Sequence, residues 1–192
     1  MKVILFSLFA VMLYGCAETT HSPASPELAG DMVNDMYQCS GSARLPDKIA
    51  DNFQAVSDPK LLAETLGAPE QGKLCQGAVY QSKSGTHVTL FRAWNSTNPG
   101  SKFGKWWAWQ KPAGPIAKYR ADYEICYQWS PLDVMVRCTL KPETKIVVGN
   151  GQSARCSEYL TYPTSGAQQI FLPDAESSLT DCQTFTGVMQ WQ

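Results

Sequence analysis

Apolar and polar residues alternate with a helical period near the start of the chain. From Glu27 to Tyr37, apolar side chains recur every three or four residues, which is the spacing of an amphipathic helix. Asp58-Pro59 is a typical helix start, and Gly67 with Pro69 predicts the end of that helix near Leu66. The pattern therefore predicts two short helices in the first part of the chain.

Beyond residue 78 the pattern changes to short runs rich in β-branched and aromatic residues, which predict strands. The predicted strands are Val88–Trp94, Phe103–Trp109, Val134–Leu140, Lys145–Val148, Gln168–Leu172 and Thr184–Gln190. Pro115–Cys126 predicts a helix between them, and Gly149-Asn150-Gly151 predicts a turn. We expect an α+β fold with a small, twisted, mostly antiparallel sheet and short N-terminal helices.

Residues 1–17 have the pattern of a signal peptide. The apolar run from Val3 to Tyr14 is too short to span a bilayer, so no transmembrane segment is expected. Cleavage after Ala17 gives a secreted protein, whereas cleavage before Cys16 gives a lipid-anchored one. Tyr14 is bulky for a lipoprotein cleavage site, and we therefore favour simple secretion.

The cysteine count indicates a disulfide-stabilised domain. One of the seven cysteines lies in the leader, and the remaining ones are Cys39, Cys75, Cys126, Cys138, Cys156 and Cys182. An even number in a secreted chain predicts three disulfides, and the sequence leaves all fifteen pairings open. Because no C-x-x-C pair is present, we expect structural disulfides and no metal ion. Asn95-Ser96-Thr97 is a glycosylation sequence, usable only in a eukaryotic host.

Composition divides the mature chain into two parts. Residues 18–77 combine a polar, disordered lead with a helical N-terminal cap, and residues 78–192 form the main domain. The charge balance is 16 basic against 17 acidic residues without a basic block, so no nucleic-acid track is expected.

Several enzyme classes lack their usual residues. Only His21 and His87 are present, which leaves little basis for a Ser-His-Asp or Cys-His hydrolase. The Gly-rich fingerprints of Rossmann and P-loop proteins are also missing. The remaining chemistry is that of arginine, glutamine and aromatic side chains.

Tryptophan and arginine concentrate in one segment. Five of the six tryptophans lie between Trp94 and Trp129, together with Arg92 and Arg120. Aromatic faces stack on rings, and guanidinium groups bind phosphate oxygens in pairs. The segment therefore predicts a ligand that is flat at one end and anionic at another, such as a nucleotide.

Ordered matches extend this prediction to a family. Leu90-Phe91-Arg92-Ala93-Trp94 resembles the L-D-R-F-G element of the tuberculosis necrotizing toxin family of NAD glycohydrolases. Other matching positions are Gly104-Lys105-Trp106-Trp107-Ala108, Pro112-Ala113-Gly114-Pro115, Arg120, Lys141-Pro142, Val147, Gly149 and Tyr162 to Ile170. The order and spacing agree over about Leu90 to Phe171, nearly half of the chain.

The resemblance implies a role for particular residues. Arg92 would bind an NAD phosphate, Arg120 would be the second functional arginine, and Gln169 would be catalytic near the scissile bond. Trp106 and Tyr119 are expected to line the NAD site. NAD would be the substrate of residues 78–192, with no further cofactor. An acceptor protein, or an inhibitor protein of a toxin, is an expected partner.

Two alternatives remain open. An ADP-ribosyltransferase would use the same residues with a macromolecular acceptor, since Gln168 to Leu172 also resembles the late strand of that superfamily. A non-enzymatic module would instead use the tryptophans to bind a carbohydrate or receptor. Asp122 and Glu124 are interpreted here as a solvated helix face rather than as a catalytic pair.

Overall fold

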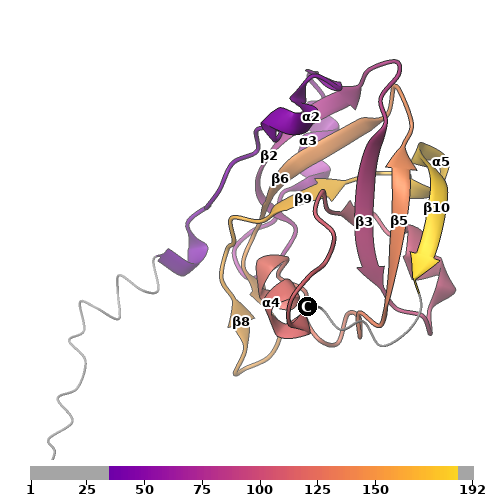
Figure 1. The fold of residues 1–192 in the computed structure, drawn as a ribbon. Helices are drawn as coiled ribbons and strands as arrows, with labels where there is room; N and C mark the ends of the chain where they lie inside the picture. Colours follow the sequence, from indigo (N-terminus) through magenta and orange to yellow (C-terminus); the bar gives the residue numbers. More distant parts are fainter. Residues whose placement is uncertain (1–34, 186–192) are drawn as a thin grey trace, which may run out of the picture.

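A five-stranded antiparallel sheet forms one wall of the protein. The computed structural model describes residues 35–185. The strand order in this sheet is β1 (Phe53–Ala55), β2 (Leu74–Ser82), β6 (Lys145–Gly151), β9 (Gln168–Phe171) and β4 (Trp106–Trp107). Neighbours far apart in the sequence, such as β2 with β6, lie side by side in the middle of the sheet (Figure 1).

A second, three-stranded sheet stands beside the first. Its order is β10 (Leu179–Phe185), β5 (Val134–Leu140) and β3 (Val88–Trp94), again antiparallel (Figure 1). A bridge between Phe91 and Ala108 connects β3 to the residue that follows β4, so the two sheets meet along this line. A small pair of strands, β7 (Ala154–Arg155) and β8 (Thr161–Tyr162), lies apart from both sheets.

The helices are short and lie around the sheets. They are α2 (Asp47–Ala50), α3 (Pro59–Thr65), α4 (Ile116–Asp122), α5 (Ala175–Ser178) and the 3₁₀ helix η1 (Pro99–Phe103). The side chain of Asp58 caps α3 by accepting a hydrogen bond from the Leu61 amide, and Pro59 occupies the first turn. The predicted second helix is thereby confirmed.

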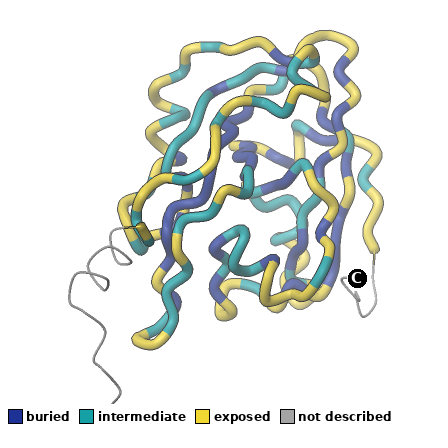
Figure 2. The backbone as a smooth tube through the Cα atoms, turned by 60° about the vertical axis from the view of Figure 1, so that its left-hand side comes forward, coloured by how far each residue is buried: buried dark blue, intermediate teal, exposed yellow. Residues whose placement is uncertain are grey.

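The main core lies where the two sheets face each other, and Figure 2 shows buried backbone concentrated on their strands. Its buried members are Phe53, Val88, Leu90, Trp94, Trp107, Val134, Val136, Cys138, Leu140, Ile146, Val148, Ile170, Leu172, Ala175 and Leu179. A smaller cluster on the other face of the five-stranded sheet packs β6 and β9 against α3. The two faces explain why β6 is apolar at successive positions instead of alternating.

Three disulfides join distant parts of the chain, as the cysteine count predicts. The pairs are Cys39–Cys75, Cys126–Cys156 and Cys138–Cys182. The first attaches the N-terminal segment to β2, and the third joins β5 to β10. The expected fold class, α+β with mostly antiparallel sheets and stabilising disulfides, is confirmed.

The strands β3 and β5 have the predicted bounds, but the predicted turn at Gly149-Asn150-Gly151 is wrong because these residues continue β6. The backbone oxygen of Gln76 on β2 would lie 2.0 Å from a Cβ atom at Gly149, so glycine permits this close pairing. Asn150 is fully buried, and its amide donates to Gly166. Of the predicted strand Phe103–Trp109, only Trp106 and Trp107 are extended in the sheet.

The predicted N-terminal features lie mainly outside the described residues. Of the helix predicted from 27 to 37, only residues 35–37 are described, and they are helical. The predicted signal peptide, 1–17, is not among the described residues. The expected boundary between residues 77 and 78 falls inside β2, in the middle of the five-stranded sheet. No helix within 35–185 is long and apolar enough to cross a membrane.

Candidate functional site

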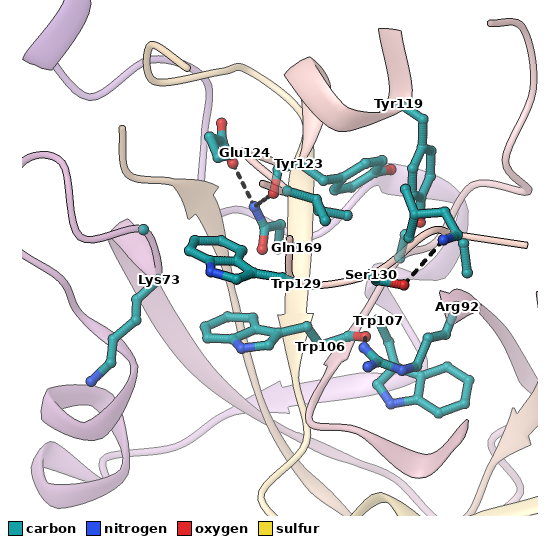
Figure 3. A pocket seen from close by; sticks show the side chains of 15 residues that line it. Lys73, Arg92, Trp106, Trp107, Tyr119, Tyr123, Glu124, Trp129, Ser130 and Gln169 are labelled. Atoms are coloured by element: carbon teal, nitrogen blue, oxygen red, sulfur yellow. Dashed lines mark hydrogen bonds between the residues drawn. The ribbon is translucent and has the colours of Figure 1, made fainter. Parts of the chain in front are cut away.

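A cavity of about 210 Å³ lies where β3 and β9 come close to the loop that follows α4. It is lined by Gly72, Lys73, Arg92, Ala93, Trp106, Trp107, Ala108, Tyr119, Tyr123, Glu124, Ile125, Trp129, Ser130, Leu132 and Gln169. Four of the five residues predicted for the site, namely Arg92, Trp106, Tyr119 and Gln169, therefore meet here (Figure 3).

Gln169 presents a defined acceptor to the cavity. Its Nε2 donates to the Tyr123 carbonyl at 3.3 Å and to Glu124 Oε2 at 2.7 Å. Because the Tyr123 carbonyl can only accept, the amide nitrogen must face it, and the amide orientation is fixed. Figure 3 shows the Gln169 oxygen on the side of the Trp129 indole. That oxygen is available to accept a hydrogen bond from a ligand.

Glu124 is the main site residue that the sequence did not reveal. The expectation of a solvated helix face is wrong for Glu124, because this residue follows α4, is 2% exposed and lines the cavity, whereas Asp122 ends the helix in an exposed ion pair with Lys118. Its backbone is in the left-handed region, with φ 47°, which turns the side chain inward. A Cβ atom at Gly151 would lie 1.7 Å from Glu124 Oε2, so only glycine leaves room for this carboxyl against β6.

Burial dominates the chemistry of this carboxyl. Desolvation raises the pKa of Glu124 to about 9, although the nearby Ser165 and the hydrogen bond from Gln169 lower it in part. Glu124 therefore keeps its proton at neutral pH in the empty cavity. Its Oε1 is buried and has no hydrogen-bond partner among the described residues. A buried oxygen without a hydrogen bond destabilises the folded state unless a ligand supplies the missing bond.

Arg92 enters the cavity from β3. Its Nε donates to the Ser101 carbonyl at 3.0 Å and its Nη1 to the Trp106 carbonyl at 2.6 Å. A Cβ atom at Gly104 would lie 2.2 Å from Nη2, so the guanidinium rests directly on the Gly104 backbone. Burial lowers the pKa of Arg92 to about 10, and the group still carries its charge at neutral pH. Within residues 35–185 no carboxylate forms an ion pair with it.

Aromatic side chains make up much of the remaining wall. Trp106 packs edge-on against Phe171, with ring centroids 5.0 Å apart, and its indole lies below that of Trp129 in the view of Figure 3. Trp129 is 54% exposed and forms part of the rim. Trp107 is buried in the main core, facing away from Trp106 as strand alternation predicts, and it also borders the cavity.

Two tyrosines complete the apolar wall. The rings of Tyr119 and Tyr123 are 4.6 Å apart. Desolvation raises the pKa of Tyr119 to about 12 and raises the pKa of Tyr123 as well. Both phenols are therefore neutral over the physiological range.

Arg120 does not line the cavity. Its guanidinium donates to the carbonyls of Ile125 and Cys126 at 3.3 Å each, and to the Ser130 carbonyl at 2.6 Å. These bonds hold the loop that carries Trp129 against α4, and Cys126–Cys156 anchors the same loop covalently. Arg120 thus stabilises the loop that forms one wall of the cavity, without lining the cavity itself.

A second hollow, of about 860 Å³, lies between α2, the start of β3 and the residues before β9. Tyr123 borders both hollows, and His87 and Trp109 lie in this one. None of the residues predicted for the site lines it.

The first cavity is electrically polarised. Figure 3 shows Glu124 and Gln169 in the upper part of the view and Arg92 with Trp107 at the lower right, while the indoles of Trp129 and Trp106 lie one above the other on the left. One side therefore carries the Glu124 carboxyl and the Gln169 amide oxygen, and the opposite side carries a fixed cation. Comparisons with protein families, characterised proteins and solved structures found no match to this chain.

Proposed function

We propose that the protein is a secreted NAD glycohydrolase, which cleaves the bond between nicotinamide and ribose. The observation that carries the proposal is the polarised cavity, which the Glu124 carboxyl, the Gln169 amide and the Arg92 guanidinium line together with aromatic side chains. NAD has the complementary order of groups: a cationic ring, a ribose with hydroxyl donors, and an anionic pyrophosphate.

The size of the cavity limits how much of NAD it can enclose. Its 210 Å³ falls below the roughly 300–1,000 Å³ of sites that bury a whole drug-sized ligand. The nicotinamide and its ribose would therefore occupy the cavity, with the ring against Trp106 and Tyr123. The pyrophosphate would lie at Arg92, whose guanidinium has further N–H groups besides those that donate to the Ser101 and Trp106 carbonyls.

The reaction suits these residues because nicotinamide leaves as a neutral molecule. The bond from C1′ to the ring nitrogen breaks with both electrons going to the ring, and positive charge develops on the ribose. The Gln169 oxygen can accept a hydrogen bond from a ribose hydroxyl or from the attacking water. Fixed acceptors around a developing cation lower the barrier electrostatically. Water adds at C1′ and releases one proton, giving ADP-ribose.

ADP-ribosyl transfer to a macromolecule is the second candidate, supported by exposed aromatic side chains near the rim. Trp129 is 54% and Tyr127 60% exposed, and both lie on the loop that Arg120 and Cys126–Cys156 hold in place. Exposed aromatics on an ordered loop are typical of protein contact surfaces. They would suit an acceptor or an inhibitor protein.

The test is release of nicotinamide from NAD by the folded, oxidised protein. Gln169→Ala should lower kcat by about 10²–10³, the usual loss when one positioned polar group is removed. Gln168→Ala is the matched control, since Gln168 is the next residue of β9 but donates to the carbonyls of Ser42 and Arg44 and does not line the cavity.

Acceptor dependence separates the two candidates. Release in buffer alone supports hydrolysis, whereas release that requires an added protein supports transfer. No release under either condition contradicts both, and full activity of Gln169→Ala removes the assigned role of Gln169.

A further inference from the structure

The cavity holds a buried acid whose role the hydrolysis reaction leaves open. Glu124 is almost fully buried, and its Oε1 has no hydrogen-bond partner in the described part of the chain. Its left-handed backbone, with φ 47°, is a further cost for a residue that has a Cβ atom. Costs of this kind are concentrated at sites where the group serves a ligand.

The surroundings hold this carboxyl in one place. Gln169 donates to its Oε2, and the missing side chain of Gly151 leaves the space that the carboxyl fills. Residues of β6 and β9 therefore hold the carboxyl in place, in addition to the loop that carries Glu124. A group fixed from three elements can discriminate between ligands.

We infer that Glu124 selects a positively charged planar ring, an N-alkylpyridinium, over a neutral ring of the same shape. The inference builds on the proposed NAD site and assigns charge selectivity there to one residue. The faces of Trp106, Tyr123 and Trp129 add cation–π attraction for the same ring. Free nicotinamide has lost the charge, so the same selectivity favours its departure after the bond is broken.

Binding of the cation should release a proton. In the empty cavity burial keeps the carboxyl protonated, since the pKa of Glu124 is raised to about 9. A cation beside it favours the ionised form, so the O–H bond breaks and the proton passes to the buffer. Affinity for the cation should therefore rise with pH, by up to about tenfold per pH unit below pH 9.

Other groups near Glu124 modify this titration without replacing it. Asp122, at the end of α4, opposes ionisation of Glu124. Lys73 and Arg92 are the cations that line the same cavity, and Tyr123 stays neutral because its pKa is raised. The partners on the remaining elements, Gln169 on β9 and the residue Ser165 before it, are uncharged.

The experiment compares 1-methylnicotinamide, a cation, with nicotinamide, its neutral counterpart of nearly the same shape. Calorimetric titration at pH 6, 7 and 8, in two buffers of different ionisation enthalpy, gives both affinity and protons released. We expect the cation to bind at least about tenfold more tightly at pH 8, with up to one proton released, and nicotinamide to release none.

Glu124→Gln should abolish the proton release and reduce the preference to what the aromatic side chains contribute, because glutamine cannot ionise. The variant keeps the shape of the side chain and an oxygen for the hydrogen bond from Gln169. Asp122→Asn is the matched control: it removes a nearby acid that pairs with Lys118 outside the cavity, and selectivity should persist. Equal affinities for the two probes in the wild-type protein, or binding of the cation without proton release, would overturn the inference. Since neither probe requires turnover, failure of NAD hydrolysis alone leaves the result interpretable.

Discussion

The main core and the cavity lie next to each other on β3 but follow opposite rules. In the core, Leu90 and Val88 are surrounded by apolar side chains from both sheets. In the cavity, Arg92 on the same strand and Glu124 beyond α4 are withdrawn from water without an ion-pair partner among the described residues. In the core, apolar side chains pack against one another. In the cavity, a charged group lacks an ion-pair partner and a carboxyl oxygen lacks a hydrogen bond within the described residues.

This difference separates stability from function. Burial of apolar surface stabilises the fold wherever the residues pack densely. Buried ionisable groups without partners lower stability, and they are kept where a ligand uses them. Variants of the core should therefore reduce stability without changing the catalytic activity of the folded protein. Variants of the cavity should change the activity without reducing stability.

The largest effect is expected at Glu124 and depends on pH. Its pKa is about 9 in the folded protein against an ordinary 4.5, so between these values the folded state holds a proton that the unfolded state has lost. Stability should therefore fall as pH rises through this window, by up to about 1.4 kcal/mol per pH unit. Glu124→Gln should remove this slope. Urea unfolding at pH 5, 7 and 9 gives the free energy of unfolding at each pH. The same pH dependence in the wild-type protein and in Glu124→Gln would contradict the raised pKa of Glu124.

A core variant provides the contrast. Leu90→Ala should lower the free energy of unfolding by about 2–5 kcal/mol, because Leu90 is fully buried between the sheets and its loss leaves a cavity. Nicotinamide release per folded molecule should stay unchanged. Thr89→Ala, on the exposed side of the same strand, should change stability by less than about 0.5 kcal/mol. Loss of activity in folded Leu90→Ala would show that core and cavity are coupled.

The smallest of these effects concerns the loop behind the cavity. Arg120→Ala should cost about 1.5–3 kcal/mol in stability, since the carbonyls of Ile125, Cys126 and Ser130 lose a charged donor. The Michaelis constant for NAD should rise as Trp129 becomes less ordered, with kcat largely retained. Lys118→Ala, an exposed position on the same helix, is the control. A fall in kcat alone would indicate that Arg120 itself contacts the substrate.

Local patterns predicted much of the fold. The β-branched runs of β3 and β5 and the Asp58-Pro59 start of α3 depend on neighbouring residues, so the sequence was sufficient for them. The turn predicted at Gly149-Asn150-Gly151 failed because those glycines serve a different purpose. They allow the Gln76 backbone and the Glu124 carboxyl to approach β6. Both of these neighbours are distant in the sequence.

The candidate site divides in the same way. The sequence pointed to Arg92, Trp106, Tyr119 and Gln169, and the structure brings these four side chains to one cavity. No local pattern pointed to Glu124, since its burial arises from contacts with Gln169 and Gly151 on other strands. From the sequence pattern, Glu124 is expected to be a solvated acid. It is buried because β6, β9 and the end of α4 come together around it in the folded protein.

The fold class, the number of disulfides and the residue types available for chemistry could be predicted from the chain alone, because they depend on composition and local spacing. Which cysteines pair, which of the two arginines lines the cavity and where the buried carboxyl lies depend on the folded arrangement. Pairing and burial are properties of contacts between distant segments. Such contacts form only when the apolar faces of the two sheets come together.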